Sequence, residues 1–198
     1  VLVSIMYANN EIGTIQPIKE IGRIIKQYKH NSGSLAGGLA SSKGWRQGYP
    51  VFHADAAQAP GVLPVMMDSL GVDMASFSAQ KFYGPKGVGF LYVSRRLTQM
   101  GRGSTRMFSP ILLGGDQEFG LRAGTENVPY IVGMASALEL AEKEREKEAE
   151  RLTELRDYFI EKVENEIPNA VLNGSREERL PGNANFSFGG VEGEQMVI

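Results

Sequence analysis

The chain contains no cysteine among its 198 residues, and it has only two histidines, His30 and His53. The lack of cysteine excludes disulfide bonds and thiolate metal sites within this sequence, and it is compatible with the cytoplasmic location that we expect. The two histidines do not have the spacing of metal ligands. We therefore predict that the chain holds no metal ion.

An excess of charge of one sign and long apolar runs are also missing. The 21 basic and 23 acidic residues leave a formal net charge of −2, which gives no electrostatic reason to expect nucleic acid or an anionic membrane as a partner. No apolar run approaches the roughly 20 residues of a membrane span, and no basic-then-apolar signal segment opens the chain. We expect neither direct nucleic-acid binding nor membrane association.

Short apolar segments at four places predict β-strands: residues 1–6, 51–54, 72–77 and 88–93. Helical or loop crossovers separate these segments, which is typical of an α/β fold. Because the first strand opens the sequence and the last residues are again apolar, we interpret the chain as an internal fragment of a longer protein.

The segments between the strands differ in character. Pro17 is expected to open a helix with Ile18, Ile21, Ile25 and Tyr28 on one apolar face. Two segments are expected to be irregular: residues 30–50, a Gly- and Ser-rich insertion with the single tryptophan, Trp45, and residues 97–110.

The last third of the chain predicts one long helix, or two abutting helices, over residues 128–167, charged over residues 142–151. An apolar stripe of Leu152, Leu155, Phe159 and Val163 follows the charged part. Residues 171–172 and 185–188 predict strands of a second, smaller domain. We therefore divide the chain into residues 1–133, part of a large domain, and residues 134–198, a bridging helix and the beginning of a small domain.

Lys81 and Asp55 are the residues that most strongly suggest a chemistry. Lys81 follows a predicted strand in a segment with few other charges, and Asp55 ends another predicted strand. A lysine that forms a Schiff base and an aspartate that holds a pyridinium nitrogen are what pyridoxal phosphate chemistry needs from a protein. Taken singly, a lysine is more often a surface group, and an aspartate is more often a cap or turn residue.

Further polar side chains follow the predicted strands. Gln58 could donate to the phenolic oxygen of the cofactor ring and Ser78 to its phosphate. Asn10 lies in a segment that could equally be an ordinary turn. Because ligands bind at the carboxyl ends of strands in such sheets, the set is more informative than each member. The Gly-rich segment with Arg122 and Thr125 could bind an anion or be a flexible loop.

Five motifs, in this order, resemble the cysteine desulfurases, which are class-V, fold-type I pyridoxal phosphate enzymes. The motifs are residues 9–13 (NNEIG), 53–58 (HADAAQ), 76–87 (SFSAQKFYGPKG), 122–125 (RAGT) and 191–194 (VEGE). The resemblance covers nearly the whole chain except the insertion. It implies a partial large domain with a mixed, mostly parallel sheet, followed by the start of an α+β C-terminal domain.

The resemblance also implies roles for individual residues. Lys81 resembles the catalytic lysine that carries the cofactor, and Asp55 the partner of the pyridine nitrogen. Gln58 and Asn10 resemble contacts to the ring oxygen, with Asn10 also near the substrate. The remaining cofactor-binding residues would be Ser78 and Gln80 as phosphate ligands and Thr125, which resembles the residue that reaches the cofactor of a neighbouring subunit in a homodimer.

Two departures from the family pattern stand out. Gln80 occupies the position just before the lysine, where the family usually has a histidine; glutamine can donate a hydrogen bond but carries no charge. In the family, the nucleophilic cysteine and the substrate-carboxylate arginine lie beyond the position of Ile198. A phosphate-binding threonine and a ring-stacking histidine lie before the position of Val1. We expect this piece alone to be inactive.

The resemblance thus implies a fragment of an enzyme that converts L-cysteine to L-alanine and keeps the sulfur as a persulfide on its own cysteine. Implied acceptors include iron–sulfur scaffold proteins and tRNA-thiolation relays. A selenocysteine lyase shares these motifs and is an alternative. A relative without cofactor that serves as a scaffold or dimerisation module is another, although a structural role needs none of Asp55, Gln58 and Lys81.

Overall fold

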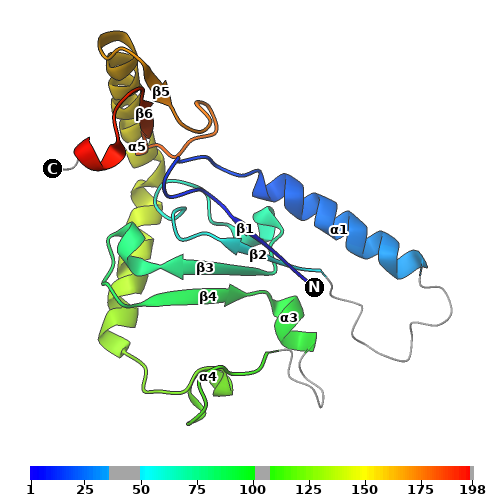
Figure 1. The fold of residues 1–198 in the computed structure, drawn as a ribbon. Coiled ribbons are helices and arrows are strands. Elements are labelled where there is room, and N and C mark those ends of the chain that lie inside the picture. Colours follow the sequence, from blue (N-terminus) through cyan, green and yellow to red (C-terminus); the bar gives the residue numbers. More distant parts are fainter. Residues whose placement is uncertain (36–49, 101–107, 197–198) are drawn as a thin grey trace.

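The structure, a computed structural model, describes residues 1–35, 50–100 and 108–196, and its main element is a four-stranded sheet (Figure 1). The strands lie in the order β1-β2-β3-β4; the first three are parallel and β4 is antiparallel to β3. Their bounds are β1 Leu2–Met6, β2 Val51–Asp55, β3 Met74–Ser78 and β4 Gly89–Val93. The predicted α/β fold with a mixed, mostly parallel sheet is confirmed.

Alternation along the strands gives the sheet two different faces. Phe52 and Ala54 of β2 and Ala75 and Phe77 of β3 are buried on one face, against the helices. His53 and Asp55, which alternate with the buried residues of β2, lie on the other face. The hydrophobic core therefore occupies one side of the sheet, and the polar side chains that follow the strands belong to the other side or to the strand ends.

Helix α1 (Ile18–Leu35) crosses between β1 and β2 and begins directly after Pro17, as predicted. Ile18 is 1% exposed and Ile25 is also buried, but Tyr28 is 61% exposed, so the predicted apolar face is buried only in its first part. Lys29 turns inward instead, because its amine meets the carboxylate of Asp73.

Two segments expected to be irregular contain helix. The insertion predicted at residues 30–50 is helical as far as Leu35, and residues 36–49, with Trp45, lie outside the described part of the chain. Residues 97–100, at the start of the other segment expected to be irregular, belong to helix α3 (Arg95–Met100), which Leu97 anchors because it is fully buried. Residues 101–107 also lie outside the described part. Two further short helices are α2 (Met67–Leu70), between β2 and β3, and α4 (Gln117–Gly120), between α3 and α5.

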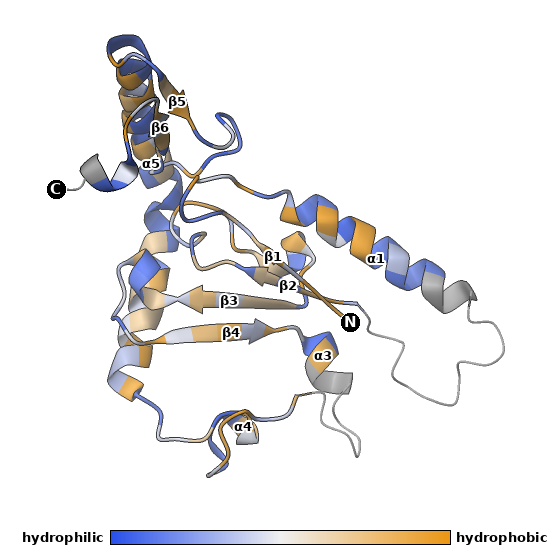
Figure 2. Cartoon of the chain, viewed as in Figure 1, coloured by the Kyte–Doolittle hydropathy of each residue, from blue (hydrophilic) through white to orange (hydrophobic). Residues whose placement is uncertain are grey.

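Helix α5 (Val128–Glu166) is the long helix predicted from the sequence, and it runs from the sheet to a small C-terminal ribbon (Figure 1). Its middle is strongly hydrophilic (Figure 2), in agreement with the charged stretch in the sequence. Met134 and Ala141 pack on the sheet core, and Ile160 and Val163 are buried further along. The predicted apolar stripe is buried only in part, because Leu155 and Phe159 are about half exposed.

The C-terminal ribbon consists of two antiparallel strands, β5 (Ala170–Leu172) and β6 (Phe186–Phe188), as the sequence indicated. The ring of Phe159 on α5 meets Phe186 edge to face, with centroids 6.3 Å apart. A single turn, η2 (Gly193–Met196), follows. Among the helices that the structure describes, none has the length and apolar character needed to cross a membrane.

Candidate functional site

The carboxyl ends of the three parallel strands place several predicted site residues at one edge of the sheet. Asp55 is the last residue of β2, and Ser78 is the last residue of β3. Lys81 follows within one turn, in η1 (Ala79–Phe82). Because β2 and β3 are parallel and directly paired, these strand ends are neighbours in space.

Asp55 is half-buried, and two hydrogen bonds fix one of its carboxylate oxygens. The backbone N–H of Ala57 donates to Oδ1 at 3.1 Å, and the hydroxyl of Ser76 donates to the same oxygen at 3.4 Å. No group in the described residues donates to Oδ2. The carboxylate is therefore held in one orientation with one oxygen available to accept a hydrogen bond from a ligand.

The turn that carries Lys81 is anchored by two buried apolar residues. Ala79 and Phe82 are fully buried in the core, whereas Gln80 and Lys81 between them are exposed. The hydroxyl of Ser78 makes no capping bond to this turn. The turn thus presents an amine, an amide and a hydroxyl at the end of β3 and keeps its own backbone fixed by packing.

Asn10 is exposed and lies in a closed loop after β1, which we call the Asn10 loop (residues 9–14). The side chain of Asn9 builds this loop: its Oδ1 accepts hydrogen bonds from the backbone N–H groups of Glu11 and Ile12, both at 2.9 Å. The segment is therefore a turn, which was one of the possibilities that the sequence left open, and the turn places Asn10 near the end of β1.

Gln58 and Thr125 have different surroundings. Gln58 is half-buried in the turn after β2, close in sequence to Asp55. Thr125 is exposed in the segment between α4 and α5, which lies on the β4 side of the sheet, away from β1 and β2 (Figure 1). The structure gathers the predicted residues of the strand ends at one edge and places Thr125 elsewhere on the same chain.

Two contributors to this edge were not identified from the sequence. Ser76 lies two residues before Ser78, so strand alternation places it on the face of Asp55, and this spacing was a usable signal. Tyr7, at the end of β1, donates its backbone N–H to the carbonyl of Asp55 at 2.8 Å. Burial raises the pKa of the Tyr7 phenol, and the hydroxyl donates to the carbonyl of Pro64 at 3.3 Å.

The donor set at this edge fits pyridoxal phosphate better than a metal ion. It combines an exposed primary amine, a fixed carboxylate with one unused oxygen, and uncapped hydroxyl and amide groups suited to a phosphate. In the described part of the chain, no group of three or more His, Cys, Asp or Glu side chains could hold a metal ion.

Comparison with known proteins places this edge in a family context. The class-V aminotransferase family profile matches residues 43–198. A relative named cysteine desulfurase IscS, from Dictyoglomus turgidum, is 50% identical over all 198 residues, which span 43% of that relative. The chain thus spans less than half the length of this curated relative.

Two solved structures share the fold. One, described as a NifS-like protein, is 37% identical with a TM-score of 0.77, over 98% of this chain and 46% of that protein. The other, described as SspA in complex with cysteine, is 33% identical with a TM-score of 0.64, over 94% and 43%. The resemblance to cysteine desulfurases seen in the sequence motifs is confirmed by these matches, and the chain belongs to the class-V aminotransferase family.

Proposed function

We propose that this chain forms the lysine-bearing part of a pyridoxal phosphate-dependent cysteine desulfurase. The observation that carries the proposal is the shared sheet edge at which Asp55, Ser78 and Lys81 follow paired parallel strands. The similarity to a protein named cysteine desulfurase, and to a solved complex with cysteine, supports cysteine as the substrate. The proposed reaction converts L-cysteine and a thiol of the enzyme into L-alanine and an enzyme persulfide.

The residues of this chain would divide the work between holding the cofactor and moving a proton. The bound cofactor supplies an electron-accepting ring, and Asp55 would keep the ring nitrogen protonated through its unused Oδ2. Ser78 and Gln80 would donate to the phosphate, and Gln58 and Asn10 to the ring oxygen. The Lys81 amine would hold the cofactor covalently and then carry a proton to or from the substrate carbon.

We propose further that two copies of the chain form a homodimer in which Thr125 contacts the cofactor of the partner subunit. The segment on either side of Thr125 exposes several large apolar side chains to solvent: Ile111, Leu113, Phe119 and Val132. Exposed apolar surface of this kind is typical of protein interfaces. Replacing Phe119 by aspartate should shift the mass measured by light scattering from dimer toward monomer.

The proposed domain boundary lies near residue 133, so that α5 would bridge a large domain and a small one. The proposal also includes a cytoplasmic location, with which the cysteine-free sequence is compatible, and transfer of the persulfide sulfur to an iron–sulfur scaffold or tRNA-thiolation relay protein. To test the transfer, the full-length enzyme that carries a persulfide with a labelled outer sulfur would be incubated with candidate acceptor proteins. The protein that gains the label is the acceptor.

The decisive experiment maps the lysine that carries the cofactor. We expect borohydride reduction of the full-length holoenzyme, followed by peptide mapping, to find the cofactor on Lys81. Lys86 is the matched control, because it is also an exposed lysine and lies in the next turn of the chain, after η1. Labelling at Lys86 would contradict the assignment.

Turnover of the same variants tests the chemistry. Lys81→Ala should abolish the conversion of L-cysteine to L-alanine, whereas Lys86→Ala should leave it nearly unchanged. An enzyme that binds the cofactor on Lys81 but acts on selenocysteine and not on cysteine would refute the proposed substrate and preserve the site.

A further inference from the structure

Arg179 is a buried arginine that is held only by neutral oxygen acceptors. It is 2% exposed, and its Nε donates to the carbonyl of Ser175 at 2.7 Å. Nη1 donates to Oδ1 of Asn183 at 2.7 Å, and Nη2 donates to the carbonyl of Asn173. Among the described residues, no carboxylate pairs with it. A buried cation is costly unless it is fully hydrogen-bonded, so this guanidinium fixes the segment that supplies its acceptors.

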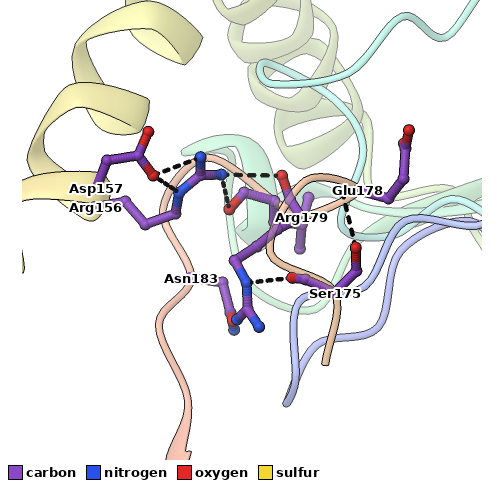
Figure 3. Close-up of polar contacts among 7 residues, drawn as sticks. Arg156, Asp157, Ser175, Glu178, Arg179 and Asn183 are labelled. Carbon is purple, nitrogen blue, oxygen red and sulfur yellow. Dashed lines mark hydrogen bonds and ion pairs between the residues drawn. The ribbon is translucent and has the colours of Figure 1, made fainter. Parts of the chain in front are cut away.

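The segment bound by Arg179, residues 173–183, is also tied to α5. Arg156 on α5 donates from Nη1 to the carbonyls of Arg179 and Leu180, at 3.2 and 3.3 Å (Figure 3). Burial and the neighbouring cations Arg156 and Arg176 lower the pKa of Arg179. The segment is therefore anchored from two sides, by its own arginine and by the long helix.

Asn183 connects this segment to the Asn10 loop. Because Arg179 occupies Oδ1 of Asn183, the amide nitrogen of Asn183 faces the other way, and it donates to the backbone carbonyl of Glu11 at 2.8 Å. Glu11 is the residue directly after Asn10. A chain of two hydrogen bonds thus runs from a buried guanidinium to the backbone beside Asn10.

Backbone contacts reinforce the same junction. Leu180 N–H donates to the carbonyl of Gly13, and Ile15 N–H donates to the carbonyl of Glu178, both at 2.8 Å. Gly13 has a φ of +73°, and a β-carbon there would lie 2.3 Å from Oδ1 of Asn183. The fit therefore depends on the absence of a side chain at this position.

We propose that Arg179 and Asn183 are positioning residues that hold the Asn10 loop at the sheet edge, and so set the place of Asn10 in the reaction. This inference rests on the proposed function for the role of Asn10. The closure of the loop itself follows from the hydrogen bonds alone. The C-terminal part of the chain, remote in sequence, thereby acts on the first strand end of the site.

The first test measures amide hydrogen exchange in the full-length protein without cofactor. Asn183→Ala should speed exchange of the Glu11, Ile12 and Gly13 amides by at least about 10-fold, while amides of β2 and β3 stay unchanged. Asn185→Ala is the matched control, because Asn185 lies only two residues further along the chain and its side chain accepts a hydrogen bond from Asn173 instead of contacting the loop. Arg179→Lys, which keeps the charge but loses the fork of donors, should give an intermediate effect.

The second test asks whether Asn183 acts through Asn10. We expect Asn183→Ala to lower kcat/KM by about 10- to 100-fold through misplacement of the loop, at unchanged cofactor occupancy. The double variant Asn10→Ala/Asn183→Ala should be no slower than Asn10→Ala alone, because a positioning residue has nothing left to position.

The outcomes separate this inference from the proposed function. Unchanged loop exchange in Asn183→Ala, or equal acceleration across the whole sheet, would overturn the positioning role whatever the lysine mapping shows. Additive losses in the double variant would overturn action through Asn10. Labelling away from Lys81, with fast loop exchange in Asn183→Ala, would refute the proposed function and leave the hold on the loop in place.

Discussion

The Nζ atom of Lys29 lies 2.7 Å from Oδ2 of Asp73, and this ion pair joins the outer part of α1 to the start of β3. The same carboxylate accepts the backbone N–H of Phe52 at 2.8 Å and pairs with Arg96 through its other oxygen. Asp73 is thus a buried hub that links α1, β2 and α3. The desolvation of Lys29 lowers the pKa of its amine, which Asp73 partly offsets.

Asp73→Asn should destabilise the protein strongly, because it leaves Lys29 buried without a counter-charge. We expect a loss of about 3 kcal/mol in the free energy of unfolding, measured in urea on the full-length protein. Lys29→Met is the matched variant and should cost only about 1 kcal/mol, since Asp73 keeps Arg96 and the Phe52 N–H as partners. A larger loss for Lys29→Met would contradict the central place of Asp73.

The buried face of α1 predicts different costs for two isoleucines on the same helix. Ile18 is 1% exposed, so Ile18→Ala should lower the free energy of unfolding by about 2–5 kcal/mol through lost contacts and a cavity. Ile24 is 64% exposed, and Ile24→Ala should change it by no more than about 0.5 kcal/mol. Similar costs for both variants would show that α1 does not pack as described.

Asp55→Asn tests the proposed carboxylate partner of the cofactor through pH dependence. Removing a negative charge next to a protonated nitrogen lowers the pKa of that nitrogen by about 1–3 units. The lower pKa favours the unprotonated ring as the pH rises, so the loss of kcat/KM should deepen with rising pH. Asp68→Asn, at an exposed aspartate of α2, is the control. A loss that does not depend on pH would argue against this role.

The parts of the fold that depend on nearby residues could be predicted from the sequence. Short apolar runs in the strands and the 3.6-residue period of the long helices are local patterns, and they located the strands and the beginnings of α1 and α5 to within a few residues. The helix pattern could not show that Lys29 turns inward while Tyr28 is exposed, because the attraction on Lys29 comes from Asp73, which is far along the chain. No pattern within the helix contains that information.

The same contrast between local patterns and contacts far apart in the sequence applies to the site. The positions of Asp55, Ser78 and Lys81 at strand ends could be predicted, because strand ends are visible in the sequence and parallel pairing brings them together. The hold on the Asn10 loop could not, because its contacts, such as that between Ser175 and Thr14, join residues 161 positions apart. A buried arginine without a carboxylate partner leaves no periodic trace in the sequence.

The glutamine at position 80 leads to the last prediction. Gln80 is exposed beside Lys81, where a histidine could add a positive charge to the proposed phosphate site. A charge-assisted hydrogen bond is worth roughly 1 kcal/mol more than a neutral one, so Gln80→His should tighten cofactor binding by about 5-fold.

Because an unperturbed histidine titrates near a pKa of about 6.5, that gain should be present below this pH and fade as the pH rises through it. Titration of the full-length apoprotein with pyridoxal phosphate on both sides of this pH would measure the change in Kd. Gln80→Met, which removes the donor without adding charge, should weaken binding at every pH. Equal affinities for the three proteins would place residue 80 outside the phosphate site.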